Sequence, residues 1–108
     1  MSDSTECLQF IREKAARLEI RITQHAHQEM TEDAIQLDDI LHVVSNGRIL
    51  EDYPNHRRGP RCLLYGADAL GRDIHVVYTT SGNALIIIAV YLPPPSKWNR
   101  PTERKTKP

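Results

Sequence analysis

The 108-residue sequence contains few cysteines, few aromatic residues and no long apolar run. Its two cysteines, Cys7 and Cys62, stand far apart without the regular spacings of a disulfide framework, so we expect two reduced thiols. The longest apolar run, residues 84–92, is about half of the ~20 residues that a membrane-spanning helix needs. The N-terminus has no basic stretch followed by an apolar one, which is the pattern of a secretory signal. We therefore expect a cytoplasmic protein with no membrane attachment.

The chain also lacks a net charge, because 14 basic and 14 acidic side chains balance each other. The two halves differ, however. Residues 1–56 hold five basic and eleven acidic side chains, whereas residues 57–108 hold nine and three. The net charges are therefore −6 and +6, and only the second half suits a polyanionic partner.

Hydrophobic periodicity predicts a helix, a strand and two more helices before Gly47. Apolar residues recur at helical spacing over residues 4–18, and alternation over residues 19–23 is typical of a short half-buried strand. A short helix is expected over residues 26–34. An amphipathic helix begins at Leu37, and we expect Gly47 to end it in the left-handed conformation.

After Gly47 the pattern predicts four strands, separated by Gly, Pro or Asn. Their expected ranges are residues 48–53, 62–65, 74–79 and 84–92. Short loops between them, at residues 68–71 and 81–83, imply an antiparallel meander with a glycine in each of these two hairpins. The predicted fold is therefore α+β, with helices on one face of the sheet and the other face left for a ligand. Residues 1–98 are expected to form a single domain, and residues 99–108 a basic, flexible tail.

The order of these elements and several short motifs resemble a bacterial family known as domain of unknown function 4258. Its fold is similar to that of the RelE, ParE and BrnT toxins, so the resemblance implies a RelE-like fold over residues 20–98. The residues that carry it are His25-Ala26 with Met30, Asn46-Gly47, Glu51-Asp52-Tyr53-Pro54, Cys62-Leu63-Leu64, Gly71-Arg72, His75-Val76-Val77 and the segment from Tyr91 to Trp98. The sequence departs from the family pattern at Glu29 and Asp33, where the family commonly has basic side chains.

His25, expected at the end of the first strand, and His75, expected on a central strand of the meander, are the first candidates for catalysis, because histidine titrates near neutrality. One could act as base and the other as acid when a ribose 2′-hydroxyl attacks the neighbouring phosphate, a reaction that needs no metal. Tyr91, at the end of the last strand, could orient a phosphate or a nucleobase. The alternative is that both histidines are structural and hydrogen-bonded within the fold.

A metal site is the weaker interpretation of the same region. His25 and His27 would point the same way on a strand and could share a zinc ion with Cys62 or His75, but they would diverge on a helix. No further spaced pairs of His or Cys support such a site, so we expect neither a metal nor a cofactor.

Basic side chains around the last strands predict contacts with a phosphate backbone, with Trp98 available to stack on a base. The alternatives are that the loop and tail are solvated, that Trp98 packs on the sheet, and that the acidic residues near Glu29 form a solvated helix face. The candidate nucleic-acid contacts are Arg57, Arg58, Arg61, Arg72, Lys97, Trp98 and Arg100.

Two functions follow from these patterns. The first is a RelE-like, metal-independent endoribonuclease or toxin that acts on RNA and is held by a cognate antitoxin. The second is a non-catalytic module of the same fold that binds a protein or a nucleic acid through its open sheet face or an edge strand.

Overall fold

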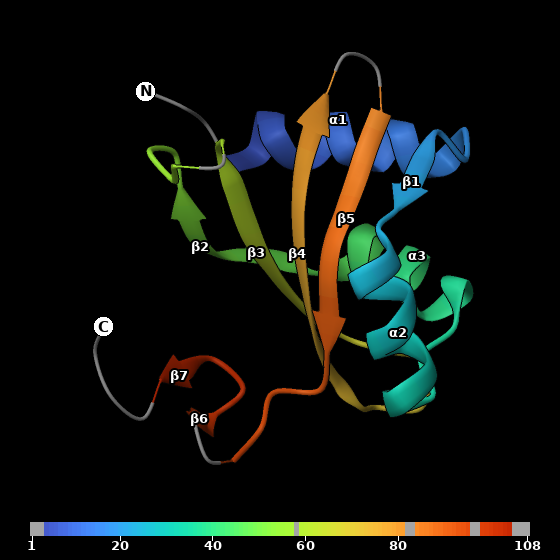
Figure 1. Ribbon diagram of the computed structural model, residues 1–108, viewed down its shortest axis with the longest axis vertical. Coiled ribbons are helices and arrows are strands. Elements are labelled where there is room, and N and C mark those ends of the chain that lie inside the picture. Colours follow the sequence, from blue (N-terminus) through green and yellow to red (C-terminus); the bar gives the residue numbers. More distant parts are fainter. Residues whose placement is uncertain (1–3, 58, 82–83, 96–97, 105–108) are drawn as a thin grey trace.

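The computed structural model describes residues 4–57, 59–81, 84–95 and 98–104. Three helices pack with a mixed sheet, whose first strand lies between α1 and α2 in the sequence, and a small hairpin follows the last strand of the sheet (Figure 1). The architecture is the α+β class predicted from the hydrophobic pattern. In chain order the elements are α1 (Ser4–Ala16), β1 (Ile20–Ile22), α2 (Gln24–Asp33), α3 (Leu37–Asn46), β2 (Arg48–Tyr53), β3 (Arg61–Ala67), β4 (Asp73–Ser81), β5 (Ala84–Tyr91), β6 (Trp98–Arg100) and β7 (Glu103–Arg104).

The strand order in the main sheet is β1-β5-β4-β3-β2. Strands β2 to β5 form the predicted antiparallel meander. β1 extends the four-stranded meander of the prediction to five strands, and it runs parallel to β5, with Ile20 opposite Leu85 and Ile22 opposite Ile87. A parallel neighbour needs a long connection, which here contains α2, α3 and the rest of the meander.

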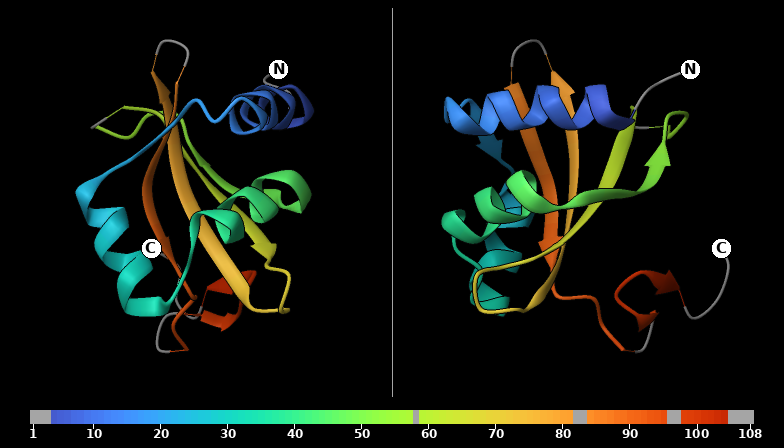
Figure 2. Two further views of the ribbon diagram at one scale, coloured as in Figure 1. Left: turned by 90° about the vertical axis from the view of Figure 1, so that its right-hand side faces the viewer. Right: turned by 180° about the vertical axis from the view of Figure 1, so that it is seen from behind.

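Side chains of β4 alternate between the two faces of the sheet. Ile74 and Val76 belong to the buried core that α1, α2 and α3 share with the strands. α1 and α3 cross this helical face, and α2 lies along β5 (Figure 2). His75 points the other way, and the register places Tyr65 and Tyr91 beside it. We call the face that carries these three residues the outer face.

α2 begins at Gln24, two residues earlier than predicted, because Thr23 caps it. The Thr23 hydroxyl accepts a hydrogen bond from the Ala26 N–H and donates one to the Ile88 carbonyl. This corrects the expected position of His25, which lies in the first turn of a helix and not at the end of a strand.

Gly47 ends α3 for a reason that differs from the prediction. Its φ of −84° and ψ of −175° are extended, not left-handed. A Cβ at this position would lie 2.5 Å from the carbonyl oxygens of Val43 and Tyr65, so glycine is required by close approach. A left-handed glycine does occur at Gly71, with φ of 86°, in the first predicted hairpin. Gly82, in the second hairpin, lies outside the described residues.

Acidic side chains of α2 cap the edge of β5 that β1 does not reach. Glu29 Oε1 accepts from the Val90 N–H at 3.0 Å, and Asp33 Oδ2 accepts from the Leu92 N–H at 3.1 Å. Residues four apart share one helix face, so both carboxylates point at the strand. The expectation of a purely solvated acidic face is therefore wrong for Glu29 and Asp33.

The β6–β7 hairpin was not predicted from the sequence. Trp98 pairs with Arg104, and Arg100 pairs with Glu103. The Trp98 side chain is 5% exposed, because it packs on His75 of the outer face. The chain beyond Leu92 therefore returns to the sheet and covers part of the surface that was expected to be open.

Candidate functional site

His75 lies at the centre of an aromatic cluster on the outer face. Its ring centroid is 4.5 Å from that of Trp98, 5.4 Å from that of Tyr91 and 6.1 Å from that of Tyr65, each in edge-to-face geometry. His75 is 0% exposed. Neighbouring strands supply Tyr65 and Tyr91, and β6 supplies Trp98. The structure thus brings three predicted site residues together, with Trp98 packed on His75 next to Tyr91.

The imidazole of His75 is held by the backbone of the C-terminal hairpin. His75 Nε2 lies 2.6 Å from the Pro101 carbonyl oxygen. A carbonyl oxygen only accepts, so Nε2 carries the proton and donates it. This nitrogen is therefore engaged within the fold, as in the structural alternative for this histidine.

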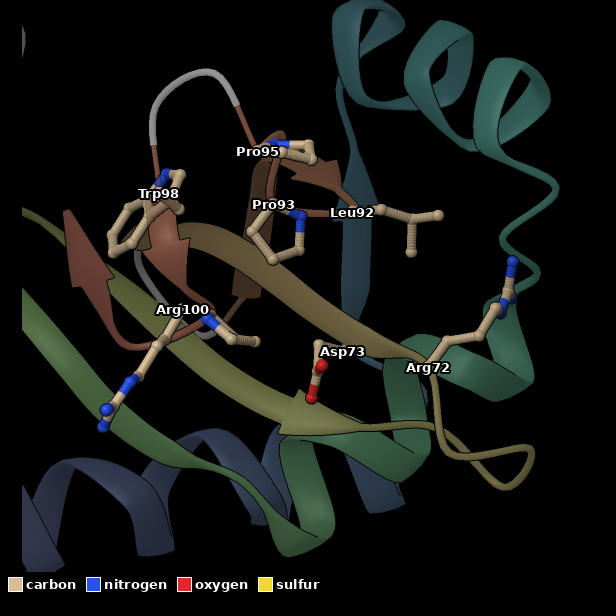
Figure 3. A pocket seen from close by; sticks show the side chains of 8 residues that line it. Arg72, Asp73, Leu92, Pro93, Pro95, Trp98 and Arg100 are labelled. Atoms are coloured by element: carbon tan, nitrogen blue, oxygen red, sulfur yellow. The ribbon is translucent and has the colours of Figure 1, made fainter. Parts of the chain in front are cut away.

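A hollow of about 390 Å³ lies beside this cluster. Figure 3 shows Trp98, Pro95, Pro93 and Leu92 along one side of it, and Arg100, Asp73 and Arg72 along the other. Leu92 follows β5, Asp73 begins β4, and Trp98 and Arg100 belong to β6. Three of the predicted nucleic-acid contacts, Arg72, Trp98 and Arg100, meet here. The complete lining is Arg72, Asp73, Leu92, Pro93, Pro95, Trp98, Arg100 and Pro101.

Asp73 is connected to the outer face through Tyr65. The Tyr65 hydroxyl donates to Asp73 Oδ1 at 2.8 Å. This hydrogen bond raises the pKa of Tyr65 above its ordinary value of 10.0, with further increases from burial and from the negative charge of Asp73, while Arg48 lowers it. The Arg48 guanidinium lies 5.8 Å from the Tyr65 ring centroid, in cation–π geometry. A cation, an aromatic ring and a carboxylate therefore adjoin one another.

Arg72 is a structural residue in this fold. Its guanidinium donates to Asp68 Oδ2 at 2.7 Å, to the carbonyls of Asp33 and Ala34 at 3.0 Å, and to Asp39 Oδ2 at 3.4 Å. These bonds join the β3–β4 hairpin to the connection between α2 and α3. The guanidinium of Arg72, a predicted phosphate contact, is thus bound within the fold, although Arg72 also lines the hollow.

Asp68 binds the Arg72 side chain and also the backbone of the β3–β4 hairpin. Its Oδ1 accepts from the backbone N–H groups of Leu70 and Arg72. Burial alone would raise the pKa of Asp68, but hydrogen bonds from the Arg72 side chain and from these two backbone groups outweigh that effect and lower it. The carboxylate is therefore stabilised in its charged form.

His25 lies elsewhere, on α2 at the edge of β5. Its side chain is 68% exposed, with Nε2 3.4 Å from Glu29 Oε1. The structure does not bring His25 and His75 together, because one is exposed beside α2 and the other is buried under Trp98. His25 and His27 occupy a helix, where residues two apart diverge, so the strand geometry needed for zinc sharing is absent. Within the described residues, no three His, Cys, Asp or Glu side chains form a group that could hold a metal ion.

The remaining predicted contacts lie around the β2–β3 connection or outside the described residues. Arg57 is exposed in that connection. Arg61 Nε donates to the Gly59 carbonyl at 3.4 Å. Arg58 and Lys97 lie outside the described residues.

Sequence reasoning missed Asp73, Tyr65 and Arg48 as site residues. The hairpin at residues 68–71 places Tyr65 opposite His75, and alternation on β4 then puts Asp73 on the same face. This register signal could have found Tyr65 and Asp73. Pro101 had no such signal, because its contact with His75 depends on where the C-terminal hairpin docks.

Comparisons with known proteins bear on the family of this chain. None of the helices in the described part is long and apolar enough to cross a membrane. No curated protein and no solved structure matches the sequence. The predicted likeness to the RelE, ParE and BrnT toxins stays a prediction. The family model with the description "Domain of unknown function (DUF4258)" matches residues 22–92, which begin at the last residue of β1, include α2, α3 and β2 to β5, and end at Leu92. The chain belongs to this family.

Proposed function

We propose that this protein binds single-stranded RNA through its outer face and does not cleave it. The observation that carries the proposal is the pairing of Arg48 with the Tyr65 ring next to the hollow that Arg100 borders. Single-stranded RNA alternates phosphates with bases. Arginine side chains can bind the phosphates, and an aromatic ring or a hollow can hold a base. The proposal follows the second of the two functions expected from the sequence.

The distribution of charge supports this choice of surface. The acidic excess of residues 1–56 lies largely on the helices, where Glu29 and Asp33 are bound to β5. The exposed arginines Arg48, Arg57 and Arg100 lie on the sheet, its loop and the C-terminal hairpin. A polyanion is attracted to the second group and repelled by the first.

The state of His75 argues against cleavage by the expected pair of imidazoles. A general base must reach the proton that it removes, whereas His75 is buried and donates through Nε2 to Pro101. His25 lies on another part of the surface. The endoribonuclease or toxin, with its cognate antitoxin, therefore ranks second and becomes an outcome of the test.

The test measures binding and cleavage in one tube. A fluorescein-labelled single-stranded RNA of mixed sequence is titrated with protein in buffer that contains a chelator, and fluorescence anisotropy measures binding. The same samples are then run on a denaturing gel, which shows whether the RNA has been cleaved. We expect saturable binding of intact RNA, weakened about tenfold or more in the Arg48→Ala, Arg100→Ala double variant. Arg17→Ala, in the turn after α1, removes an exposed arginine that lies away from the outer-face arginines in the sequence and is the control.

Equal losses in the control and the double variant would overturn the assignment to the outer face. RNA fragments that persist in chelator and vanish in His75→Ala would replace the proposal with the endoribonuclease. A wild-type protein with no measurable affinity for RNA would overturn RNA binding altogether.

A further inference from the structure

The hollow combines one carboxylate with apolar walls. Asp73 is the one acidic side chain in a lining that otherwise consists of leucine, three prolines, tryptophan and two arginines. Figure 3 shows Asp73 between Arg72 and Arg100, opposite Pro93 and Leu92. A volume of about 390 Å³ lies in the range of small-ligand sites and exceeds what one planar base requires.

Asp73 retains acceptor capacity towards a ligand. Tyr65 donates to Oδ1 at 2.8 Å, which orients the carboxyl group. A carboxylate has two oxygens with about four acceptor positions, so one hydrogen bond leaves room for two more. The group can therefore accept a pair of parallel donors from a ligand in the hollow.

Guanine is the RNA base that offers this pair. Its Watson–Crick edge carries two adjacent donors, N1–H and the N2 amino group, whereas adenine and cytosine present a donor beside an acceptor, and uracil presents one donor between two acceptors. Two parallel donors match the two oxygens of a carboxylate. Proline and tryptophan side chains contact the flat faces of a base with no preference for its edge.

The positive charge beside the hollow favours a nucleotide over a cationic ligand. An arginine or lysine side chain of a protein partner would also match Asp73, but it would enter beside the exposed Arg100 and be repelled by it, whereas the charge of Arg72 is already paired with Asp68 and Asp39. A nucleotide brings a neutral base for Asp73 and a phosphate for the exposed Arg100. The charges of the hollow therefore favour a nucleotide.

We propose that this hollow binds a guanine base of single-stranded RNA, with Asp73 accepting hydrogen bonds from guanine N1–H and N2–H. The inference rests on the proposed RNA binding and adds base selectivity to it. Arg72 takes no part in recognition, because its donors are held by Asp68 and the α2–α3 connection.

The test compares pentanucleotides that differ only at the central base. Labelled UUGUU, UUAUU, UUCUU and UUUUU are titrated with the full-length protein at one salt concentration. We expect UUGUU to bind about tenfold more tightly than the other three, as for a good bidentate contact. Replacing guanine with inosine, which lacks the N2 amino group, is expected to remove most of this preference without any change in the protein.

Variants then assign the preference to Asp73. Asp73→Asn replaces one acceptor oxygen with a donor group, which no longer matches the two donors of guanine, so the tenfold preference for UUGUU is expected to be lost. Asp38→Asn makes the same change at an exposed position on α3 and is expected to keep the tenfold ratio.

The outcomes separate this inference from the proposal on which it rests. Wild-type protein that binds none of the RNAs overturns both. Tight binding of all four RNAs with equal affinity, or a guanine preference that survives Asp73→Asn, overturns guanine recognition alone. Competition by arginine amide but not by guanosine monophosphate would assign the hollow to a cationic peptide and overturn the proposal. The inosine comparison remains decisive even where Asp73→Asn does not fold.

Discussion

The carboxylates of Glu29 and Asp33 accept hydrogen bonds from backbone N–H groups that a neighbouring strand would otherwise bind. The resemblance to the family leads us to expect basic side chains at these positions, and a lysine or arginine has no acceptor for a backbone N–H. In this chain both positions hold carboxylates that accept from β5. The change of charge is therefore linked to the packing of α2 on the sheet.

Replacing Glu29 with lysine is expected to destabilise the fold by about 1–3 kcal/mol, because the partly buried Val90 N–H loses its acceptor. Glu29→Gln keeps an oxygen acceptor and is expected to lose less. Urea unfolding measures both values. Glu32→Lys, at an exposed position of the same helix, is the control and is expected to change stability by less than about 0.5 kcal/mol. Equal stability of Glu29→Lys and Glu32→Lys would contradict this role.

Asp68 gives the fold an acid-sensitive contact. Its pKa is lowered in the folded state relative to its ordinary value of 3.8, so it stabilises the fold above that value, and this contribution is lost as the pH falls through the lowered pKa. We expect Asp68→Asn to lower the urea midpoint clearly at pH 7 and to differ progressively less from wild type below pH about 4. Asp38→Asn is the control. A difference for Asp68→Asn that stays constant with pH would contradict the assignment.

At the scale of elements, α3 and β3 meet with no space for a side chain. A Cβ at Gly47 would lie 2.5 Å from two backbone oxygens, whereas a Cβ at Gly66 would lie 3.1 Å from Val43 Cγ1 and 3.2 Å from Gly47 Cα, so a smaller displacement relieves the contact. We expect Gly47→Ala to destabilise the protein by about 3 kcal/mol and Gly66→Ala by about 1 kcal/mol. Thermal unfolding of the two variants measures the order, and the reverse order would contradict the contact geometry.

The C-terminal hairpin acts as a cover for the outer face. Trp98 and Pro101 enclose His75, and both lie beyond Leu92, where the family match ends. Removal of the indole in Trp98→Ala is expected to expose His75 to diethyl pyrocarbonate, which modifies accessible imidazoles. Mass spectrometry locates the modification. The exposed His25 is expected to react in every variant and is the internal control. Protection of His75 in Trp98→Ala equal to that in wild type would show that other residues cover it.

At the scale of the whole molecule, the exposed Arg48, Arg57 and Arg100 lie on the sheet, its loop and the C-terminal hairpin, whereas α2 and α3 carry acidic side chains and no basic ones apart from histidine. An RNA that approaches the exposed Arg48, Arg57 and Arg100 is attracted, while the acidic helices repel it. If these arginines make about three phosphate contacts, the logarithm of the binding constant is expected to fall with the logarithm of salt concentration with a slope of about −2. Arg48→Ala is expected to reduce the magnitude of this slope by about 0.7. A binding constant independent of salt would contradict an electrostatic interface.

The sequence determined the α+β class, the four meander strands and the two layers, because these depend on local periodicity and on Gly, Pro and Asn between strands. The amphipathic stripe from Leu37 and the hairpin at residues 68–71 are such local signals, and both appear in the fold. Register also follows from a short hairpin, which is why the proximity of Tyr65 and His75 was within reach of the sequence.

Only the tertiary structure decided which side chains meet. His25 and His75 are equivalent in a list of candidates, but α2 places one at an exposed edge and the C-terminal hairpin encloses the other. Arg72 joins the β3–β4 hairpin to the α2–α3 connection, and Asp73 lines the hollow with residues of the C-terminal segment. Both roles depend on contacts with segments distant in the sequence. Periodicity reports the face of an element on which a residue lies, whereas the partner on that face depends on how elements pack. That packing is a property of the whole chain.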